Sequence, residues 1–139
     1  MAVPGKVETV TLKDLAATLC GRVIRPGREQ PDGSRARSRT FRALNPLSPE
    51  DIRLLTFVAR PEHGISGLRN KDLRGELYHG EPADDAERRR RSAQVSRQLS
   101  LLRAHGIVEK VSKSHRYRVT ETGRYALTAL LAAANATTP

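Results

Sequence analysis

The spacing of apolar residues in the middle of the chain predicts a first helix from Pro49 to about Arg60. Ser48 suits the N-cap position, proline suits the first helical turn, and Glu50 and Asp51 place negative charge where the helix dipole favours it. The proline that follows the segment is expected to end the helix. The apolar stripe that we expect to be buried consists of Ile52, Leu55 and Val58, with Leu54 nearby.

Two further helices are predicted before the pattern changes. The second begins at Asn70, which we expect to cap it, and turns Leu73 and Leu77 inward. The third covers roughly residues 86–105 and ends at Gly106, because glycine adopts positive φ easily. Its core face repeats at i, i+4 and i+7 and consists of Val95, Leu99 and Leu102.

The next stretch alternates apolar with polar residues, which is typical of strands. Residues 107–111 and 115–120 flank a Ser-Lys-Ser turn and predict a tight hairpin, with Tyr117 and Val119 on one face. A final helix capped by Thr120 follows, with a stripe made of Leu127, Leu130 and Leu131. The expected fold class is therefore mainly α with a small β-hairpin, that is α+β.

The N-terminal part of the chain is specified less clearly. We interpret residues 1–44 as an appendage, residues 45–135 as the folded domain and residues 136–139 as a tail. Thr11 is expected to cap a short helix with Leu12, Leu15, Ala16 and Leu19 on one face. Around the turn at residues 31–33, flanking apolar pairs predict either a small hairpin or a mobile basic arm, and the pattern alone does not separate the two.

Charge is sorted along the chain rather than mixed. The 139 residues carry a formal net charge of +10. Residues 47–87 hold nine acids and five bases, whereas residues 88–118 hold ten bases and one acid, Glu109. This distribution favours a polyanionic partner, either nucleic acid or an anionic membrane surface. The apolar run near residues 126–134 is too short to span a bilayer, and the N-terminus has no apolar signal-peptide core, so we expect a cytoplasmic protein without a membrane partner.

The segment VSRQLSLLRAHGIVEKVSKSHRYRVTETG resembles the recognition helix, wing and closing helix of winged helix-turn-helix proteins of the broad bacterial MarR and GntR type. The stretches RALNPLSPEDIRLL and GLRNKDLRGELY further resemble the C-terminal winged-helix region of long, poorly characterised bacterial proteins. The positions that match the MarR and GntR pattern are Ser92, Val95, Ser96, Arg97, Leu99, Leu102, Gly106, Ile107, Val108, Tyr117, Val119, Thr120 and Gly123. The resemblance implies a winged helix-turn-helix fold that binds double-stranded DNA, with residues 86–105 as recognition helix and residues 107–120 as basic wing.

The side of the third helix opposite its core face is small, polar and basic, as entry into a DNA groove requires. Gln94 and Arg97 carry forked donors that suit adenine and guanine, respectively. The candidates for base readout are Ala93, Gln94, Arg97 and Ser100, while Arg90 and Ala104 share the outward side. The candidates for phosphate contacts are Arg88, Arg89, Arg90, Arg91, Ser92, Lys110, Lys113 and Arg116, and those on the arm are Arg35, Arg37 and Arg39. Alternatively, Arg88 to Arg91 form only the solvent-exposed start of the helix and make no phosphate contacts.

Other chemistry has little support in the sequence. Cys20 has no second cysteine to pair with, and we expect it to be a small buried hydrophobe. The histidines at positions 63, 79, 105 and 115 have no metal-site spacing and are expected to have ordinary surface roles. No glycine-rich phosphate-binding loop precedes a helix. We therefore expect no metal, no cofactor and no enzymatic activity.

These patterns lead to the expectation of a bacterial, nucleoid-associated protein that binds specific double-stranded DNA sequences and regulates transcription. The alternative is a winged-helix interaction module that binds RNA, DNA without sequence preference, or an acidic protein partner within a nucleoprotein assembly. The closing helix can pack within its own monomer or against a second copy. The two-fold symmetry of most operators slightly favours a homodimer.

Overall fold

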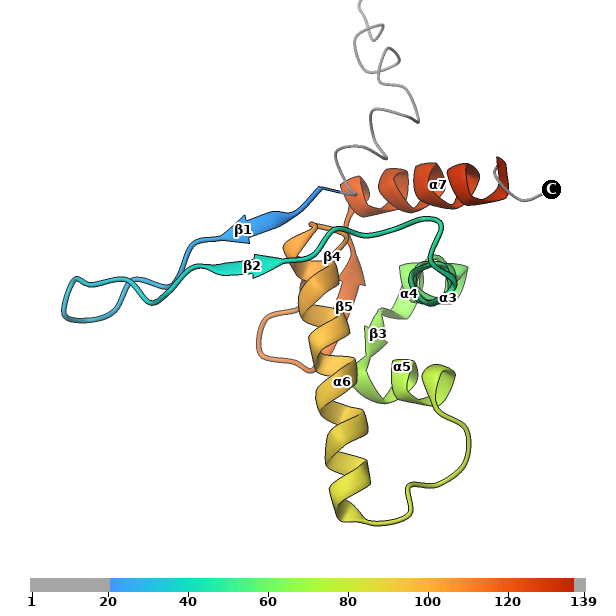
Figure 1. Cartoon of the computed structure of the whole chain (residues 1–139), viewed down its shortest axis with the longest axis horizontal. Helices are drawn as coiled ribbons and strands as arrows, with labels where there is room; N and C mark the ends of the chain where they lie inside the picture. The colour runs from blue at the N-terminus through green and yellow to red at the C-terminus, as the bar shows by residue number, and fades with distance from the viewer. Residues whose placement is uncertain (1–20, 137–139) are drawn as a thin grey trace, which may run out of the picture.

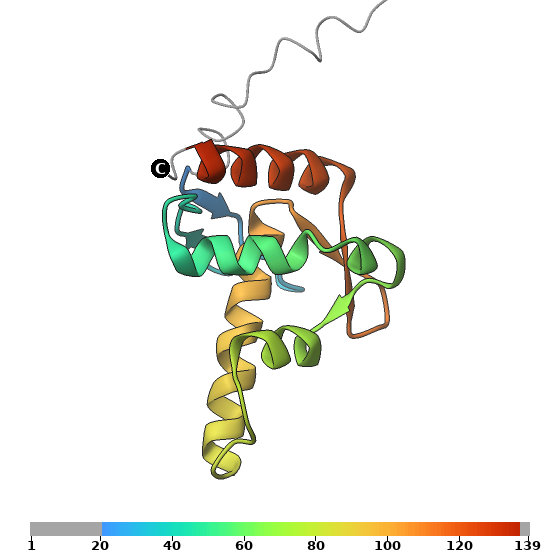
Figure 2. The same ribbon diagram turned by 90° about the vertical axis from the view of Figure 1, so that its right-hand side faces the viewer.

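The computed structural model describes residues 21–136, which form five helices and two small antiparallel sheets (Figures 1 and 2). This described part is α+β, as the sequence predicts. The helix expected between Thr11 and Leu19, together with Cys20, lies outside the described residues.

The N-terminal segment forms a β-hairpin, one of the two alternatives left open by the sequence. Strand β1 (Val23–Arg25) pairs antiparallel with β2 (Arg39–Phe41), and an isolated bridge between Glu29 and Arg35 continues the pairing toward the tip. The tip is closed by a carboxylate oxygen of Asp32, which accepts a hydrogen bond from the Ser34 amide at 2.9 Å. In Figure 1 this β1–β2 hairpin projects to the left of the helices.

Helix α3 (Pro49–Val58) begins as predicted, with the Ser48 hydroxyl accepting a hydrogen bond from the Asp51 amide at 3.4 Å. Its buried face differs from the prediction, because Ile52 is only half-buried while Phe57 is buried. Phe57 contacts the ring of His63 in the next helix at 4.5 Å between centroids, so a neighbouring element covers the side that the pattern had left open. The other buried members of α3 are Asp51, Leu54, Leu55 and Val58.

Two elements between the predicted helices were not anticipated. Pro61 begins helix α4 (Pro61–Ser66) rather than a loop, since proline is well suited to a first helical turn. At Gly67, with φ of 74°, the chain turns into the short strand β3 (Leu68–Arg69). Strand β3 pairs with β5 (Arg116–Val119) and anchors this segment to the sheet.

Helix α5 (Asn70–Leu77) packs against the long helix α6 (Asp85–Ala104). The N-cap residue of α5 is Arg69, not Asn70 as predicted, and its amide donates to the Asp72 carboxylate at 2.8 Å. Leu73 is fully buried and Leu77 is half-buried. The predicted core face of α6 is confirmed, because Val95, Leu99 and Leu102 are all buried.

The predicted C-terminal hairpin and closing helix are confirmed. Strands β4 (Val108–Lys110) and β5 pair antiparallel, giving the sheet order β3-β5-β4. Helix α7 (Glu121–Ala136) follows, and the Thr120 hydroxyl accepts from the Gly123 amide at 2.8 Å. Gly123 lies so close to β4 that a Cβ atom there would stand 2.2 Å from the Ile107 carbonyl oxygen.

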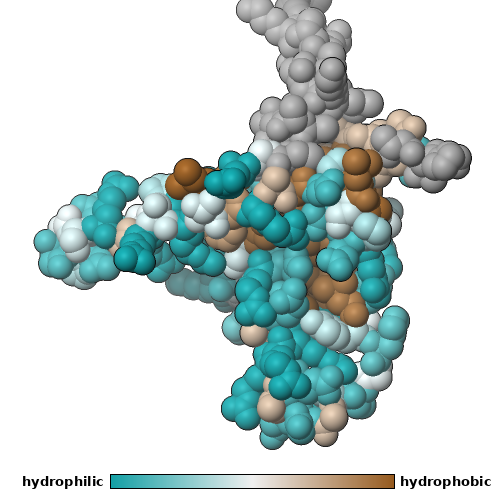
Figure 3. All heavy atoms as spheres, in the orientation of Figure 1, coloured by the Kyte–Doolittle hydropathy of each residue, from teal (hydrophilic) through white to brown (hydrophobic). Residues whose placement is uncertain are grey.

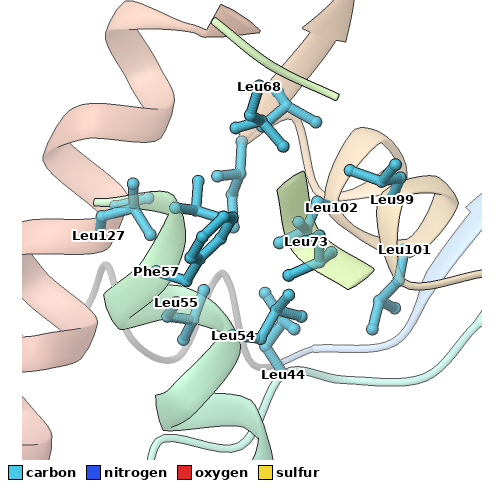
Figure 4. Close-up of a cluster of buried hydrophobic side chains, with 14 of the residues drawn as sticks. Leu44, Leu54, Leu55, Phe57, Leu68, Leu73, Leu99, Leu101, Leu102 and Leu127 are labelled. Carbon is cyan, nitrogen blue, oxygen red and sulfur yellow. The ribbon is translucent and has the colours of Figure 1, made fainter. Parts of the chain in front are cut away.

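The core lies among α3, α5, α6, α7 and the sheet, with leucine as its main residue (Figure 4). Leu44, from the segment between the β1–β2 hairpin and α3, is fully buried beside Leu54. The end of the predicted appendage therefore packs into the core. Helix α7 contacts α3 and lies above it in both Figure 1 and Figure 2. The largest fully buried side chains are those of Leu44, Leu55, Leu68, Leu73, Leu99, Leu102, Ile107 and Leu130.

Candidate nucleic-acid interface

The candidate base-reading residues lie along one partly exposed strip of α6. Ala93 and Arg97 are exposed, whereas Gln94 and Ser100 are half-buried. The guanidinium of Arg97 donates two hydrogen bonds to the side-chain oxygen of Gln94, at 3.3 Å from Nε and 2.9 Å from a terminal nitrogen. The two forked side chains that the sequence treats separately thus form one joined polar unit.

The amide side chain of Asn70 holds α5 against α6 just beside this strip. It donates to the Ser92 carbonyl oxygen at 3.2 Å and to the Ser96 hydroxyl at 3.1 Å. Ser92, a predicted phosphate ligand, is half-buried at this junction. The loop between the helices, residues 78–84, is longer than the three or four residues common in helix-turn-helix motifs.

The arginines at the start of α6 do not share one role. Arg91 is largely buried, with 16% of its side chain exposed, and donates to the Gly80 carbonyl oxygen at 2.9 Å and to Glu87 at 3.1 Å. Its guanidinium also lies over the Tyr78 ring, 5.0 Å from the centroid. Arg91 therefore fastens the α5–α6 loop to α6.

The three neighbouring arginines are all exposed but differ in their contacts. Arg88 forms an ion pair with Asp85 at 3.2 Å, and Arg89 donates to the Asp85 carbonyl oxygen at 3.3 Å. The exposed Arg90 makes no ion pair with any of the described residues. The backbone amide of Ala83 holds the pKa of Glu87 below its usual range, with a further contribution from Arg91. The first turn of α6 thus remains acidic at neutral pH.

The β4–β5 hairpin carries the remaining predicted phosphate ligands, but on two different sides. Lys110 and Lys113 are exposed and line a hollow beside α6. Arg116 instead borders a hollow near α4 and α7, where it donates to the Ser66 carbonyl oxygen at 2.8 Å. Arg118 pairs with Glu109 across the two strands. The structure therefore separates Arg116 from the two lysines.

The β1–β2 hairpin lies against the C-terminal end of α6, which corrects one prediction. Ala104 was expected on the outward side of α6 but is only 5% exposed, because β1 covers it and Arg25 donates to its carbonyl oxygen. Of the predicted arm residues, Arg37 and Arg39 border a hollow shared with Ser100. Arg35 pairs with Glu29 in the distal bridge and does not border that hollow.

A buried polar network at the base of this hairpin was not foreseen. Asp51 is 3% exposed and accepts hydrogen bonds from two guanidinium nitrogens of Arg42, at 2.9 and 2.8 Å, and from the Asn45 amide at 2.9 Å. Nε2 of His105 lies 2.9 Å from the Arg42 carbonyl oxygen. His105 and His63 are both buried, so the prediction of surface roles is wrong for these two histidines.

The surface hydropathy differs between the candidate interface and the rest of the molecule. In Figure 3 the β1–β2 hairpin and the lower part of α6 present mostly hydrophilic side chains, whereas hydrophobic ones appear between α6 and α3. Within residues 21–136, no three metal-binding side chains gather as a metal site. None of the helices in that range has the length and apolar character needed to cross a membrane.

Comparison with known proteins gives no relative for this chain. No protein-family model matches the sequence, and no curated protein or solved structure matches it significantly.

Proposed function

We propose that this protein is a winged helix-turn-helix protein that binds double-stranded DNA, with α6 as the recognition helix and the β4–β5 hairpin as the wing. The observation that carries the proposal is the exposed strip of α6 that bears Ala93, Gln94 and Arg97 beside the junction with α5. In helix-turn-helix proteins the second helix of such a pair lies in the major groove while the first crosses the backbone. The regulation of transcription is the role that this binding mode serves most often.

The chemistry of the strip supports base contacts. A small residue at position 93 lets the helix backbone approach the groove, and Arg97 presents a planar donor fork that matches the acceptors of guanine. Because Arg97 is already oriented by Gln94, little side-chain freedom is lost when the pair meets a base edge.

Charge along α6 supports a particular section of the helix as the reader. The first turn carries Asp85 and Glu87 and is capped by Asp84, so phosphates would be repelled there. From Arg88 to Ala104 the helix has no acid. We therefore assign base contacts to the outward-facing residues Ala93, Gln94 and Arg97, with phosphate contacts from Arg90 and from the β4–β5 hairpin lysines.

The test is selection of bound duplexes from a random DNA pool by the full chain, followed by competition with RNA and with random duplex. The proposal is supported if the selected duplexes share a common sequence and if random duplex competes only weakly with them for the protein. Equal binding of RNA and DNA with no enriched sequence would contradict it and favour the interaction-module alternative. An Arg124→Ala variant is a suitable control, since Arg124 is exposed on α7 and borders the hollow near α4 rather than α6.

A further inference from the structure

A basic hollow of about 700 Å³ lies where the β1–β2 hairpin, the end of α6 and the β4–β5 hairpin meet. Arg28 reaches it from the first hairpin, Arg103 from α6, and Lys110 and Lys113 from the second hairpin. These four residues are separated by up to 85 positions in the sequence, so the fold itself brings the cations together. Of the four, the two lysines are individual phosphate candidates in the sequence, and Arg28 belongs to the predicted basic arm.

Within residues 21–136, the four cations of this hollow form no ion pair. No acidic residue lines it, and none of the four side chains has a hydrogen bond or ion pair to any described residue. By contrast, Arg42, Arg60 and Arg118 each have a carboxylate partner. Like charges that converge without a partner repel one another, and a bound anion removes that penalty.

The hollow continues into a second one between the β1–β2 hairpin and α6. Arg28, Arg103 and Lys110 border both, and the second adds Arg25, Arg37 and Arg39. Its one acidic lining residue is Glu109, whose carboxylate is already paired with Arg118. An elongated basic surface of this kind fits a chain of phosphates better than a single small anion. Arginine forks and flexible lysines are also the usual side-chain ligands of phosphate.

We propose that this hollow, bordered by Arg28, Arg103, Lys110 and Lys113, is a second contact site for a nucleic-acid phosphate backbone. It deepens the proposed function, on which it rests for the class of ligand, by assigning the β1–β2 hairpin and the β4–β5 hairpin to one joint backbone clamp. Phosphate contacts carry affinity but no sequence information. The site therefore contributes to binding of any duplex, independently of the bases that α6 reads.

The experiment compares the double variant Arg28→Ala/Lys113→Ala with wild type on a preferred and on a random duplex over a range of salt concentrations. Loss of two phosphate contacts should make the slope of log K against log salt shallower by about two and weaken both duplexes by roughly tenfold or more. The matched control is Arg53→Ala/Arg124→Ala, which removes the same charge from exposed positions on α3 and α7, outside the hollow and outside the α5–α6 pair. We expect it to change binding much less.

Three results would overturn the assignment. One is a wild-type salt slope in the double variant, and another is an equal loss in the control variant, which would indicate net charge alone. The third is displacement of the duplex by inorganic phosphate at an ionic strength well below that at which sodium chloride displaces it, which would identify a free-anion site. Thermal melts establish that each variant is folded. If Arg28→Ala/Lys113→Ala is not folded, the single variant Lys113→Glu at the exposed turn takes its place.

These outcomes are separable from failure of the proposed function. If no preferred sequence exists, the random-duplex measurements still test the hollow. If a preferred sequence exists and Arg28→Ala/Lys113→Ala changes neither affinity nor salt slope, α6 remains the reader and only the clamp is rejected.

Discussion

Arg42 and Asp51 form a two-pronged ion pair, with nitrogen–oxygen distances of 2.8 and 2.9 Å, that joins the base of the β1–β2 hairpin to the start of α3. Asp51 is almost fully buried, whereas about half of the Arg42 side chain is exposed. Because His105 at the end of α6, 63 positions away, also contacts the Arg42 carbonyl oxygen, the hairpin base, the start of α3 and the end of α6 meet here. This network fixes where the β1–β2 hairpin leaves the domain and so where its arginines lie relative to α6.

Replacement of Asp51 should destabilise the fold. Asp51→Ala leaves the Arg42 guanidinium and the Asn45 amide without their acceptor, and we expect a loss of about 2 to 3 kcal/mol in the free energy of unfolding. Urea unfolding measures this loss. The neighbouring Glu50→Ala removes an exposed first-turn acid and should cost about 0.5 kcal/mol. Similar effects of both variants would contradict a special role for Asp51.

The same ion pair predicts how stability depends on pH. Burial by itself would raise the pKa of Asp51, but hydrogen bonds from Arg42 and the Asn45 amide, with the Arg42 charge, hold it below the ordinary 3.8. A pKa that is lower in the folded than in the unfolded state gives stabilisation that is complete above the unfolded pKa and is lost as pH falls through the folded pKa.

The difference in Tm between wild type and Asp51→Asn should therefore be present at pH 5 and above and shrink below about pH 4. Thermal melts at a series of pH values measure it. A difference that stays unchanged down to pH 3, or that shrinks above pH 6, would show that the carboxylate charge is not its source.

Gly123 should be intolerant of any side chain. A Cβ atom there would stand 2.2 Å from the Ile107 carbonyl oxygen, so Gly123→Ala must push α7 away from the backbone of Ile107, which precedes β4. We expect a loss of about 1 to 3 kcal/mol in the free energy of unfolding. The control is Gly75→Ala in α5, where nothing lies within 4 Å of the added Cβ. There, alanine should stabilise the helix by about 0.5 to 1 kcal/mol, and a loss at both glycines would point to a cause other than crowding.

Arg90 and Arg91 are adjacent in sequence, but only replacement of Arg91 by alanine should destabilise the fold. Arg91→Ala removes the contacts with Gly80, Glu87 and Tyr78, and should lower the free energy of unfolding by about 1 to 2 kcal/mol. Arg90→Ala should leave stability nearly unchanged. Denaturant unfolding of the two variants makes the comparison, and equal stability would show that the Arg91 contacts contribute little.

Long periodic elements were predictable from the sequence, and short ones were not. Helices α3, α6 and α7 and the β4–β5 hairpin follow from apolar spacing and capping residues. Helix α4 has six residues and β3 has two, too few to establish a period, and β3 is specified by pairing with β5, about 48 positions away.

The site was predictable as a strip but not in its contacts. The core face of α6 determines its outward face, and Ala93, Gln94 and Arg97 follow from that geometry alone. Ala104 was misplaced because helical projection treats everything opposite the core as solvent, whereas β1 covers this end of the helix. The dipole of α3 already explains an acidic residue at position 51. The sequence therefore provided no reason to expect that Asp51 pairs with Arg42.

Arg97 offers the sharpest test of α6 as the reader of bases. Its guanidinium is exposed and oriented by Gln94, so Arg97→Ala should cost about 1 to 3 kcal/mol on the preferred duplex and flatten discrimination at one base position. Binding to random duplex should change much less.

Arg97→Lys separates shape from charge at this position. Lysine keeps the positive charge but lacks the planar fork, so it should retain affinity for random duplex while losing most of the discrimination. Gln94→Ala removes the acceptor that orients Arg97 and should weaken discrimination at the same base position, because the guanidinium then samples other rotamers. Competition binding with single-base variants of the selected duplex measures all three variants. If base preferences persist in folded Arg97→Ala protein, another element reads the DNA and the assignment of α6 fails.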